Sequence, residues 1–238
     1  MEYREFIFEW KVTMSFMIKL SIALAAVAAI GCGVAASSAS KPDVNIAAVA
    51  PTPAKPADTR SDQLETAVLA GGCFWGMEGV FEHVKGVTDV KSGYAGGKKK
   101  NPSYEQVSDG DTGHAESVKI TFDPSKITYA QLLTIFFSVH DPTEKNRQGP
   151  DEGTQYRSAI FYTNDDQKKT ATDFIAGINN AKIFAKPVAT EVTPFDAFYE
   201  AEAYHQHYLD NHPTDGYIVY NDLPKIEVLK KKFPDLYK

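Results

Sequence analysis

The stretch Gly-Gly-Cys-Phe-Trp-Gly, residues 71–76, joins a strand-like run at Glu65–Leu69 to a helix-like run at Met77–Val84. Cys73 therefore lies at a strand-to-helix turn, and the two glycines before it let the backbone turn sharply and approach a ligand closely. The first turn of the helix leaves unpaired N–H groups near the sulfur, and these dipoles favour a thiolate. Their effect, about 0.3–1 kcal/mol, shifts a thiol pKa by less than about one unit. A substrate or another donor must complete the activation.

Two interpretations of this cysteine are open. Cys73 can be a buried structural cysteine, with Phe74 and Trp75 as core aromatic residues. A buried structural thiol, however, does not need glycines that keep atoms away from it. The glycines on both sides therefore favour a nucleophile.

Length and charge limit the class of protein. The 238 residues carry a net charge of −6 and fit one globular domain with extensions. A domain from about Glu65 onward would bury roughly 70% of the surface of its unfolded chain, which is enough for a core without stabilising disulfides or metal ions. An acidic chain without a basic stripe argues against binding to nucleic acid.

The N-terminal region predicts export. An apolar run at Leu20–Ile30 follows Met17 and is too short to span a bilayer. Cys32, directly after Gly31, resembles the cysteine of a bacterial lipoprotein signal, which is lipidated and becomes the first residue of the mature chain. We expect residues 1–31 to be a signal peptide and the protein to be a periplasmic or cell-envelope lipoprotein. A signal peptide cut nearby is the alternative.

The segments on either side of this signal differ from it. Residues 1–16 mix acidic and basic side chains and fit a signal poorly, so Met14 and Met17 are both candidates for the true start. Residues 32–64 have few large apolar side chains, which predicts a disordered tether. The catalytic domain is expected at residues 65–238.

Hydrophobic periodicity predicts alternating strands and helices through this domain. Further strands are expected at Val87–Tyr94, Ser117–Phe122, Arg157–Tyr162 and Val188–Val192, and helices at Thr128–Val139, Asp165–Asn179, Phe198–Leu209 and Pro224–Lys238. Several strand links are too short for a crossover helix. The prediction is an α+β fold, a two-layer α/β sandwich with a mixed sheet and a ferredoxin-like core with extensions. A long polar loop, His140–Gln155, suits a functional segment.

Linked motifs follow the cysteine. They are GCFWG (72–76), GYAGG (93–97), NPSYEQV (101–107), TGHAE (112–116), HDPT (140–143), NRQG (146–149), DEGTQYRSAIFY (151–162) and AEAYHQHYL (201–209). In order and spacing, over about Ala67–Lys238, they resemble the peptide methionine sulfoxide reductase A family. The resemblance implies an enzyme that reduces the S epimer of methionine sulfoxide, free or in proteins, and so repairs oxidised proteins.

Sulfoxide reduction needs a nucleophile and a proton donor, and Glu116 is the expected donor. It extends the apolar face of the strand at Ser117–Phe122, where desolvation raises a carboxyl pKa and keeps the group protonated near neutral pH. A rim glutamate paired with a lysine is the alternative. The resemblance favours the acid, because a glutamate after Gly-His-Ala is the proposed acid in similar enzymes.

The resemblance also implies the other pocket residues. Tyr104 and Tyr156 match the two tyrosines that hydrogen-bond the sulfoxide oxygen, Asp151 matches an aspartate that contacts the substrate backbone, and His205 matches a histidine beside the pocket. Without it, either tyrosine would be read as a core aromatic residue.

Phe74 and Trp75 are expected to cradle the substrate methyl group, since an aromatic wall holds an S-methyl group well. A pocket with donors on one side and rings on the other can select one epimer. Cys73 is expected to attack the sulfoxide sulfur and to become a sulfenic acid.

The chain departs from the commonest family pattern at its C-terminus. Many members carry a resolving cysteine in a glycine-rich tail, whereas Pro224–Lys238 contains none, and Ser108 stands where many relatives have a cysteine. A lipidated Cys32 could not resolve a sulfenic acid. We therefore expect no bound cofactor and an external reductant, a thioredoxin-like protein or a small thiol. The expected partners are this reductant and oxidised proteins, and the chain is expected to be a monomer.

Other readings remain open. A thiol peroxidase or oxidoreductase could use the same Cys73, and a surface lipoprotein could bind methionine-rich partners without turnover. No metal site is predicted, because His205 and His207, two residues apart on a helix, would point in different directions.

Overall fold

The structure is a computed structural model that describes Ile46 and residues 63–238. The predicted signal peptide with Cys32, and the predicted tether apart from Ile46, lie outside the described residues. Ile46 itself is buried in the main hydrophobic core. Within the described part of the chain, no helix combines the length and the apolar character that crossing a bilayer requires.

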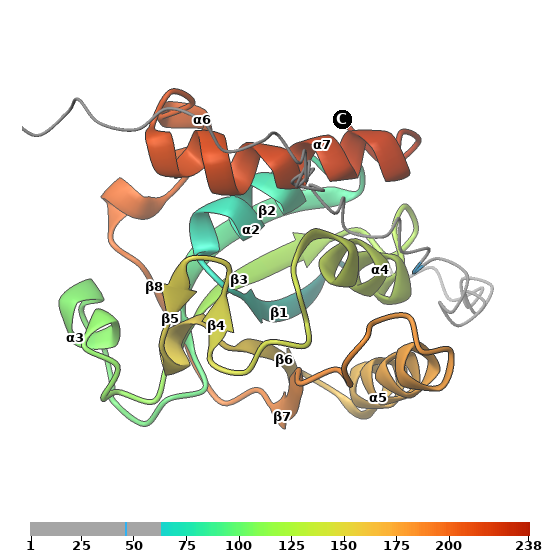
Figure 1. Ribbon diagram of the computed structural model, residues 1–238, viewed down its shortest axis with the longest axis horizontal. Helices are drawn as coiled ribbons and strands as arrows, with labels where there is room; N and C mark the ends of the chain where they lie inside the picture. Colours follow the sequence, from blue (N-terminus) through green and yellow to red (C-terminus); the bar gives the residue numbers. More distant parts are fainter. Residues whose placement is uncertain (1–45, 47–62) are drawn as a thin grey trace, which may run out of the picture. The chain divides into compact units, whose positions relative to one another are not determined.

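A mixed sheet forms the centre of the domain (Figure 1). Its strand order is β7-β6-β1-β3-β2-β8, in which β6 and β7 are parallel and the other neighbours are antiparallel. The strands are β1 Glu65–Gly71, β2 Val87–Ala95, β3 Ala115–Phe122, β6 Ser158–Tyr162, β7 Glu191–Pro194 and β8 Phe198–Glu200. Its four central strands, with the helices after β1 and β3, form the β-α-β-β-α-β unit of a ferredoxin-like core. The predicted fold class is confirmed.

Helices cover one face of this sheet, where α7 lies over α2 (Figure 1). The α-helices are α2 Phe74–Glu82, α3 Tyr104–Ser108, α4 Tyr129–Val139, α5 Asp165–Asn180, α6 Tyr208–Asn211 and α7 Leu223–Lys232. Shorter elements are the hairpin β4 Arg147–Gln148 and β5 Asp151–Glu152, the 3-10 turns η2 Thr154–Tyr156 and η3 Ala203–His205, and the π-helical turn η4 Ile218–Asp222. The two short strands fall within the long polar loop.

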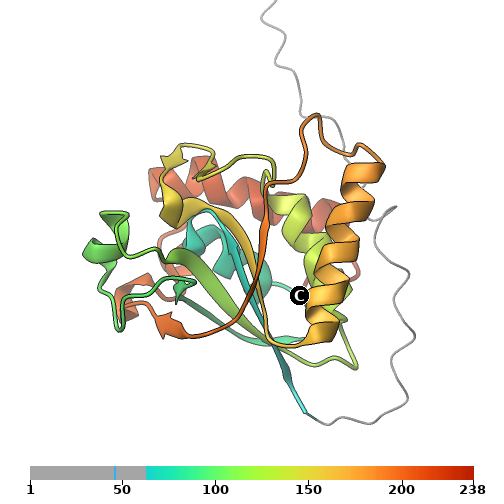
Figure 2. The same ribbon diagram turned by 90° about the horizontal axis from the view of Figure 1, so that it is seen from below.

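Strand alternation divides the apolar residues of β1 between two clusters. Ala67 and Leu69 belong to the main core under the helices, whereas Val68 and Ala70 face a smaller cluster on the opposite side. The segment from β7 to β8 crosses that opposite side, as Figure 2 shows, and brings Phe195 against the smaller cluster. Both faces of the central strands are therefore covered.

The predicted helix at Phe198–Leu209 is wrong. Its first residues form β8, which pairs with β2 at the edge of the sheet, and the rest forms η3 and α6. His207 adopts a left-handed conformation with φ of 55°, which interrupts the helix. Edge pairing outweighed an apolar pattern that fits a helix.

Smaller differences concern boundaries. The strand expected at Val188–Val192 is found at Glu191–Pro194, and the last helix ends at Lys232. The short helix α3 was not predicted. It is fixed by a capping box, in which Ser103 accepts from the Gln106 N–H and the Gln106 side chain accepts from the Ser103 N–H.

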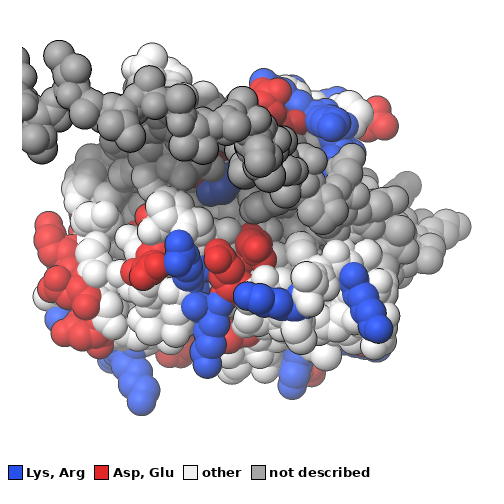
Figure 3. Space-filling model, viewed as in Figure 1, with Lys and Arg blue, Asp and Glu red and all other residues white. Residues whose placement is uncertain are grey.

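Charges of both signs are mixed on the face of the domain that Figure 3 shows. On the face shown in Figure 3, acidic and basic side chains of the described residues are interspersed and form no continuous basic stripe. The ion pairs include exposed i,i+3 and i,i+4 pairs such as Lys230–Glu227 and Lys169–Asp173. Such exposed pairs contribute little to stability.

Candidate active site

The predicted turn positions Cys73 at the start of a helix. β1 ends at Gly71, α2 begins at Phe74, and Cys73 occupies the N-cap position between them. Gly72 has φ of 91°, and a Cβ built there would lie 2.5 Å from Cγ of Gln148 in the long polar loop. Position 72 therefore requires glycine, because the backbone there has a positive φ and because the loop that carries Gln148 approaches it closely.

Glu116 lies beside the turn that carries Cys73. It projects from β3, and its Oε2 accepts a hydrogen bond of 3.0 Å from the backbone N–H of Phe74. Glu116 is 2% exposed and Cys73 is 8% exposed, so both are nearly closed off from bulk water. The structure thus brings together the two groups that the sequence assigned to attack and protonation.

Burial sets the charge state of Glu116. Desolvation is the main cause that raises its pKa to about 8, and the charges of Asp151 and Asp222 add to this shift. The Phe74 N–H acts in the opposite direction because it stabilises the carboxylate. Glu116 is therefore mostly protonated at neutral pH.

Burial also keeps the Cys73 thiol neutral. Desolvation raises its pKa well above the usual value, and the charges of Glu116 and Asp222 act in the same direction. Lys225 and the backbone N–H of Trp75 lower it. The helix dipole that the sequence suggested as an activator is thus present but weaker than burial.

An aromatic wall stands beside the cysteine. Trp75 stacks on Tyr208 with ring centroids 3.8 Å apart, and Tyr217 approaches Trp75 edge-on at 6.0 Å. The indole N–H of Trp75 donates to Nδ1 of His205 over 3.1 Å. Phe74 is more deeply buried, 1% exposed, and packs against His205. These contacts fix the ring of Trp75.

The two predicted tyrosines lie around the same carboxyl. Burial is the main cause that raises the pKa of both Tyr104 and Tyr156, and the charge of Glu116 contributes to both shifts. The phenols therefore remain neutral donors. The backbone of Tyr104 is held by Glu202, whose Oε1 accepts from its N–H over 2.8 Å, and its ring packs against His205.

Several residues of this site were not predicted from the sequence. Tyr217 donates a hydrogen bond to the carboxylate of Asp151 and so orients it. Asp222 and Lys225 form an ion pair of 2.8 Å near Cys73. All three come from the C-terminal segment, and the only sequence signal was Gly76, which leaves room for the ion pair over α2.

The ion pair fits against the first turn of α2 because position 76 is glycine. A Cβ built on Gly76 would lie 2.1 Å from Oδ1 of Asp222 and 2.7 Å from Nζ of Lys225. Contacts this close do not occur, so any larger residue at position 76 would displace the pair.

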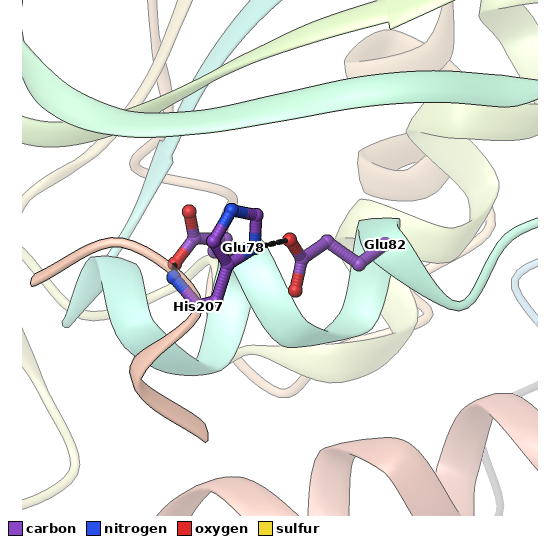
Figure 4. A group of neighbouring side chains, drawn as sticks. All are labelled: Glu78, Glu82 and His207. Carbon is purple, nitrogen blue, oxygen red and sulfur yellow. Dashed lines mark hydrogen bonds and ion pairs between the residues drawn. The ribbon is translucent and has the colours of Figure 1, made fainter. Parts of the chain in front are cut away.

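A second cluster of ligand-type side chains lies further along α2. Glu78 and Glu82 meet His207, and one possible ligand atom of each lies within 4.8 Å of the others (Figure 4). The ring of His207 pairs closely with Glu82, and its backbone N–H donates to Oε2 of Glu78 over 2.9 Å. Burial is the main cause that raises the pKa of Glu78 to about 7. A cation held by all three side chains would have to displace the contact between the His207 ring and Glu82.

His205 and His207 diverge, but not for the predicted reason, because they do not share a helix: η3 ends at His205 and His207 has left-handed backbone. His205 accepts from Trp75 in the pocket, whereas His207 pairs with Glu82 on the outer side of α2. A hollow of about 490 Å³ lies elsewhere, and it contains neither Cys73 nor Glu116. It is lined by Asn101, Pro102, Ser103, Phe198, Tyr199, Glu200 and Glu202. The bonding around Cys73 locates the candidate site better than the size of this hollow does.

Comparison with known proteins places this architecture in a family. Residues 65–236 match the family profile described as peptide methionine sulfoxide reductase. Peptide methionine sulfoxide reductase MsrA 2 of Mesorhizobium japonicum is 58% identical over 174 residues, which cover 73% of this chain and 89% of that protein. The MsrA of Sulfolobus acidocaldarius is 54% identical over 172 residues, which cover 72% of this chain and 97% of that protein.

Solved structures agree. The reduced form of Mxr1 from Saccharomyces cerevisiae matches with a TM-score of 0.61 at 38% identity, over 64% of this chain and 87% of that one. Methionine sulfoxide reductase A of Corynebacterium diphtheriae matches with a TM-score of 0.58 at 32% identity, over 69% of this chain and 84% of that one.

Replacing Gly76 by alanine should destabilise the domain by about 1–3 kcal/mol, because the new methyl group overlaps the Asp222–Lys225 pair. Gly216→Ala is the matched control: position 216 is also helical, and a Cβ there has nothing within 4 Å. Helix propensity should make this control neutral or stabilising by up to about 1 kcal/mol. Urea denaturation measures both, and equal effects would refute the crowding at Gly76.

Proposed function

Because this chain belongs to the peptide methionine sulfoxide reductase family, we propose that Cys73 is the nucleophile of its reaction and Glu116 the proton donor. The chain is a peptide-methionine (S)-S-oxide reductase, which reduces methionine sulfoxide to methionine. One observation carries the assignment of residues. The buried carboxyl of Glu116 is hydrogen-bonded to the N–H of the residue that follows Cys73.

The proposed reaction balances without an added proton. The Cys73 sulfur attacks the sulfoxide sulfur, and Glu116 protonates the sulfoxide oxygen. The bond between that oxygen and the substrate sulfur then breaks, and the oxygen passes to the Cys73 sulfur. The substrate leaves as methionine and Cys73 becomes a sulfenic acid, while the thiol proton restores Glu116. The cysteine sulfur is oxidised and the methionine sulfur is reduced.

The neutral resting state supports this sequence of events. Burial favours a neutral thiol and a neutral carboxylic acid. A protonated Glu116, with the phenols of Tyr104 and Tyr156, can donate to the sulfoxide oxygen. As the oxygen takes up the proton, the substrate sulfur becomes a better electrophile. Activation of the cysteine is therefore coupled to the presence of substrate.

Selection of one epimer follows from the asymmetry of the site. In this proposal Trp75 and Phe74 cradle the methyl group, while Glu116 and the tyrosines supply donors to the oxygen. Asp151, oriented by Tyr217, is available to the substrate backbone. Exchanging the oxygen and the methyl group would place a polar atom against the rings.

An external thiol is the proposed reductant. Cys73 is the single cysteine among the described residues, and it is free. Cys32, the other cysteine of the sequence, is proposed to be lipidated. The sulfenic acid would then be reduced by a thioredoxin-like protein or a small thiol. The proposed substrates are free methionine sulfoxide and oxidised proteins.

The purified enzyme, with dithiothreitol as reductant, should reduce the S epimer of methionine sulfoxide much faster than the R epimer. Cys73→Ser should abolish turnover, whereas Cys32→Ser should retain it because Cys32 takes no part in the reaction. Resolved epimers and chromatographic detection of methionine provide the measurement. Faster consumption of hydrogen peroxide than of either epimer would instead indicate a thiol peroxidase.

Activity should depend on a protonated Glu116. Its raised pKa of about 8 means that kcat/KM should be level below that pH and should fall as the pH rises through it. Glu116→Gln should lower kcat by about 10²–10⁴ and remove this fall. The pH profiles of both proteins test this, and a profile of Glu116→Gln like that of the wild type would contradict the assignment.

Export and anchoring form a separate proposal, supported by the apolar run at Leu20–Ile30 and by Cys32 after Gly31. The chain expressed in a bacterium should fractionate with membranes and carry a lipid-sized mass increase on an N-terminal Cys32. Cys32→Ser should release it into the soluble fraction. A purified protein that still contains residues 1–31 and has the mass of the unmodified chain would contradict the proposal.

A further inference from the structure

The mechanism above leaves one buried charged pair unused. Asp222, at the end of η4, is 0% exposed, and the Lys225 side chain, in the first turn of α7, is 13% exposed. Their charged atoms lie 2.8 Å apart. Burying two charges has a desolvation cost that their attraction often fails to offset, so such a pair is weak evidence for a stabilising role. A role in the chemistry of the site is the alternative.

The position of the pair suggests that role. It rests on Gly76, which lies three residues after Cys73 in the first turn of α2. Residues three apart on a helix are neighbours on one face. The pair therefore occupies the end of α2 that carries the nucleophile, and the small residue at position 76 brings it close to the helix backbone.

The charges around the sulfur are unbalanced without Lys225. The groups whose charge or protonation is linked to that of Cys73 come from six segments and are Glu116 on β3, Asp222 on η4, Lys225 on α7, Tyr104 on α3, Tyr156 on η2, and Tyr208 and Tyr217 near α6 and η4. The charge of Asp222 opposes a thiolate, and so does that of Glu116 when it is ionised. Lys225 gives the strongest contribution that favours it, ahead of the Trp75 N–H.

We propose that Lys225 is a positioning residue that supplies the counter-charge for the Cys73 thiolate, and that Asp222 holds Lys225 over the first turn of α2 and offsets part of its charge. This deepens the proposed function, because it rests on Cys73 being the nucleophile. Asp222 keeps the lysine ordered in the resting enzyme, and its own negative charge helps to keep the thiol protonated.

The bonding of Asp222 fits this balance. Oδ1 accepts from Lys225, whereas Oδ2 is buried and has no hydrogen-bond partner among the described atoms. The carboxylate is therefore held mainly by the lysine. If the pair only held α7 against α2, removing either charge would weaken the packing of the two helices. If the pair sets the pKa of the Cys73 thiol, removing Lys225 and removing Asp222 must change that pKa in opposite directions.

The test measures the titration of Cys73 in a Cys32→Ser background, using the rate of alkylation by iodoacetamide against pH and mass spectrometry of the intact protein. Lys225→Met should raise the midpoint by about one pH unit or more, which slows alkylation about tenfold below the midpoint. Asp222→Asn, which keeps the shape but removes the charge, should lower the midpoint.

Two further variants make the comparison specific. Lys230→Met is the matched control, because Lys230 lies on the same helix and pairs with exposed Glu227. It should leave the midpoint unchanged. Lys225→Arg, which keeps the positive charge, should hold the midpoint near that of the parent protein.

An unchanged midpoint in Lys225→Met, or shifts of the same sign in both charge-removing variants, would overturn the proposal. If circular dichroism shows that Lys225→Met does not fold, the Asp222→Asn variant alone tests the proposal. An unchanged or raised Cys73 midpoint in Asp222→Asn would then overturn it. The readout needs no methionine sulfoxide. If the midpoints do not shift but the parent protein reduces methionine sulfoxide, only this inference is refuted. If the midpoints shift as expected but the parent protein does not reduce methionine sulfoxide, only the proposed function is refuted.

Discussion

The hydrogen bond from the backbone N–H of Phe74 to Glu116 joins the first turn of α2 to the middle of the sheet, and the active site depends on it. The contact requires β3 to lie beside β1, because β1 leads directly into the turn that carries Cys73. It also requires a buried carboxyl whose pKa burial raises to about 8. One contact thus joins the strand order of the fold to the chemistry of the site.

Burial has opposite consequences for the two reacting groups. It keeps Glu116 protonated, which suits a proton donor, but it also keeps Cys73 protonated, which does not suit a nucleophile. The helix dipole at an N-cap position is too weak to overcome this. In the proposed mechanism the sulfur becomes reactive only with substrate and the Lys225 cation present, which would protect it from adventitious oxidation. On this proposal the enclosed site gives selectivity as well as catalysis.

The C-terminal segment completes the site in this chain. Tyr217 fixes Asp151, and Asp222 and Lys225 lie over the start of α2, while α7 itself packs on the helical layer. Gly72 and Gly76 each accept a close neighbour, Gln148 on one side and the ion pair on the other. The glycines around Cys73 therefore make room for two distant segments, in addition to freeing the backbone at the turn.

The sequence by itself determined the α+β core and the identity of the turn, because strand alternation, helical periodicity and the Gly-Gly-Cys-Phe-Trp-Gly run are local patterns. Linked motifs also pointed to Glu116, Tyr104 and Tyr156. Only the tertiary structure decided that Phe198–Glu200 is an edge strand, since pairing with β2 supplies hydrogen bonds that local propensity cannot register. It alone placed Asp222 and Lys225 beside Cys73, because residues about 150 positions apart in the chain meet only when α7 packs over α2.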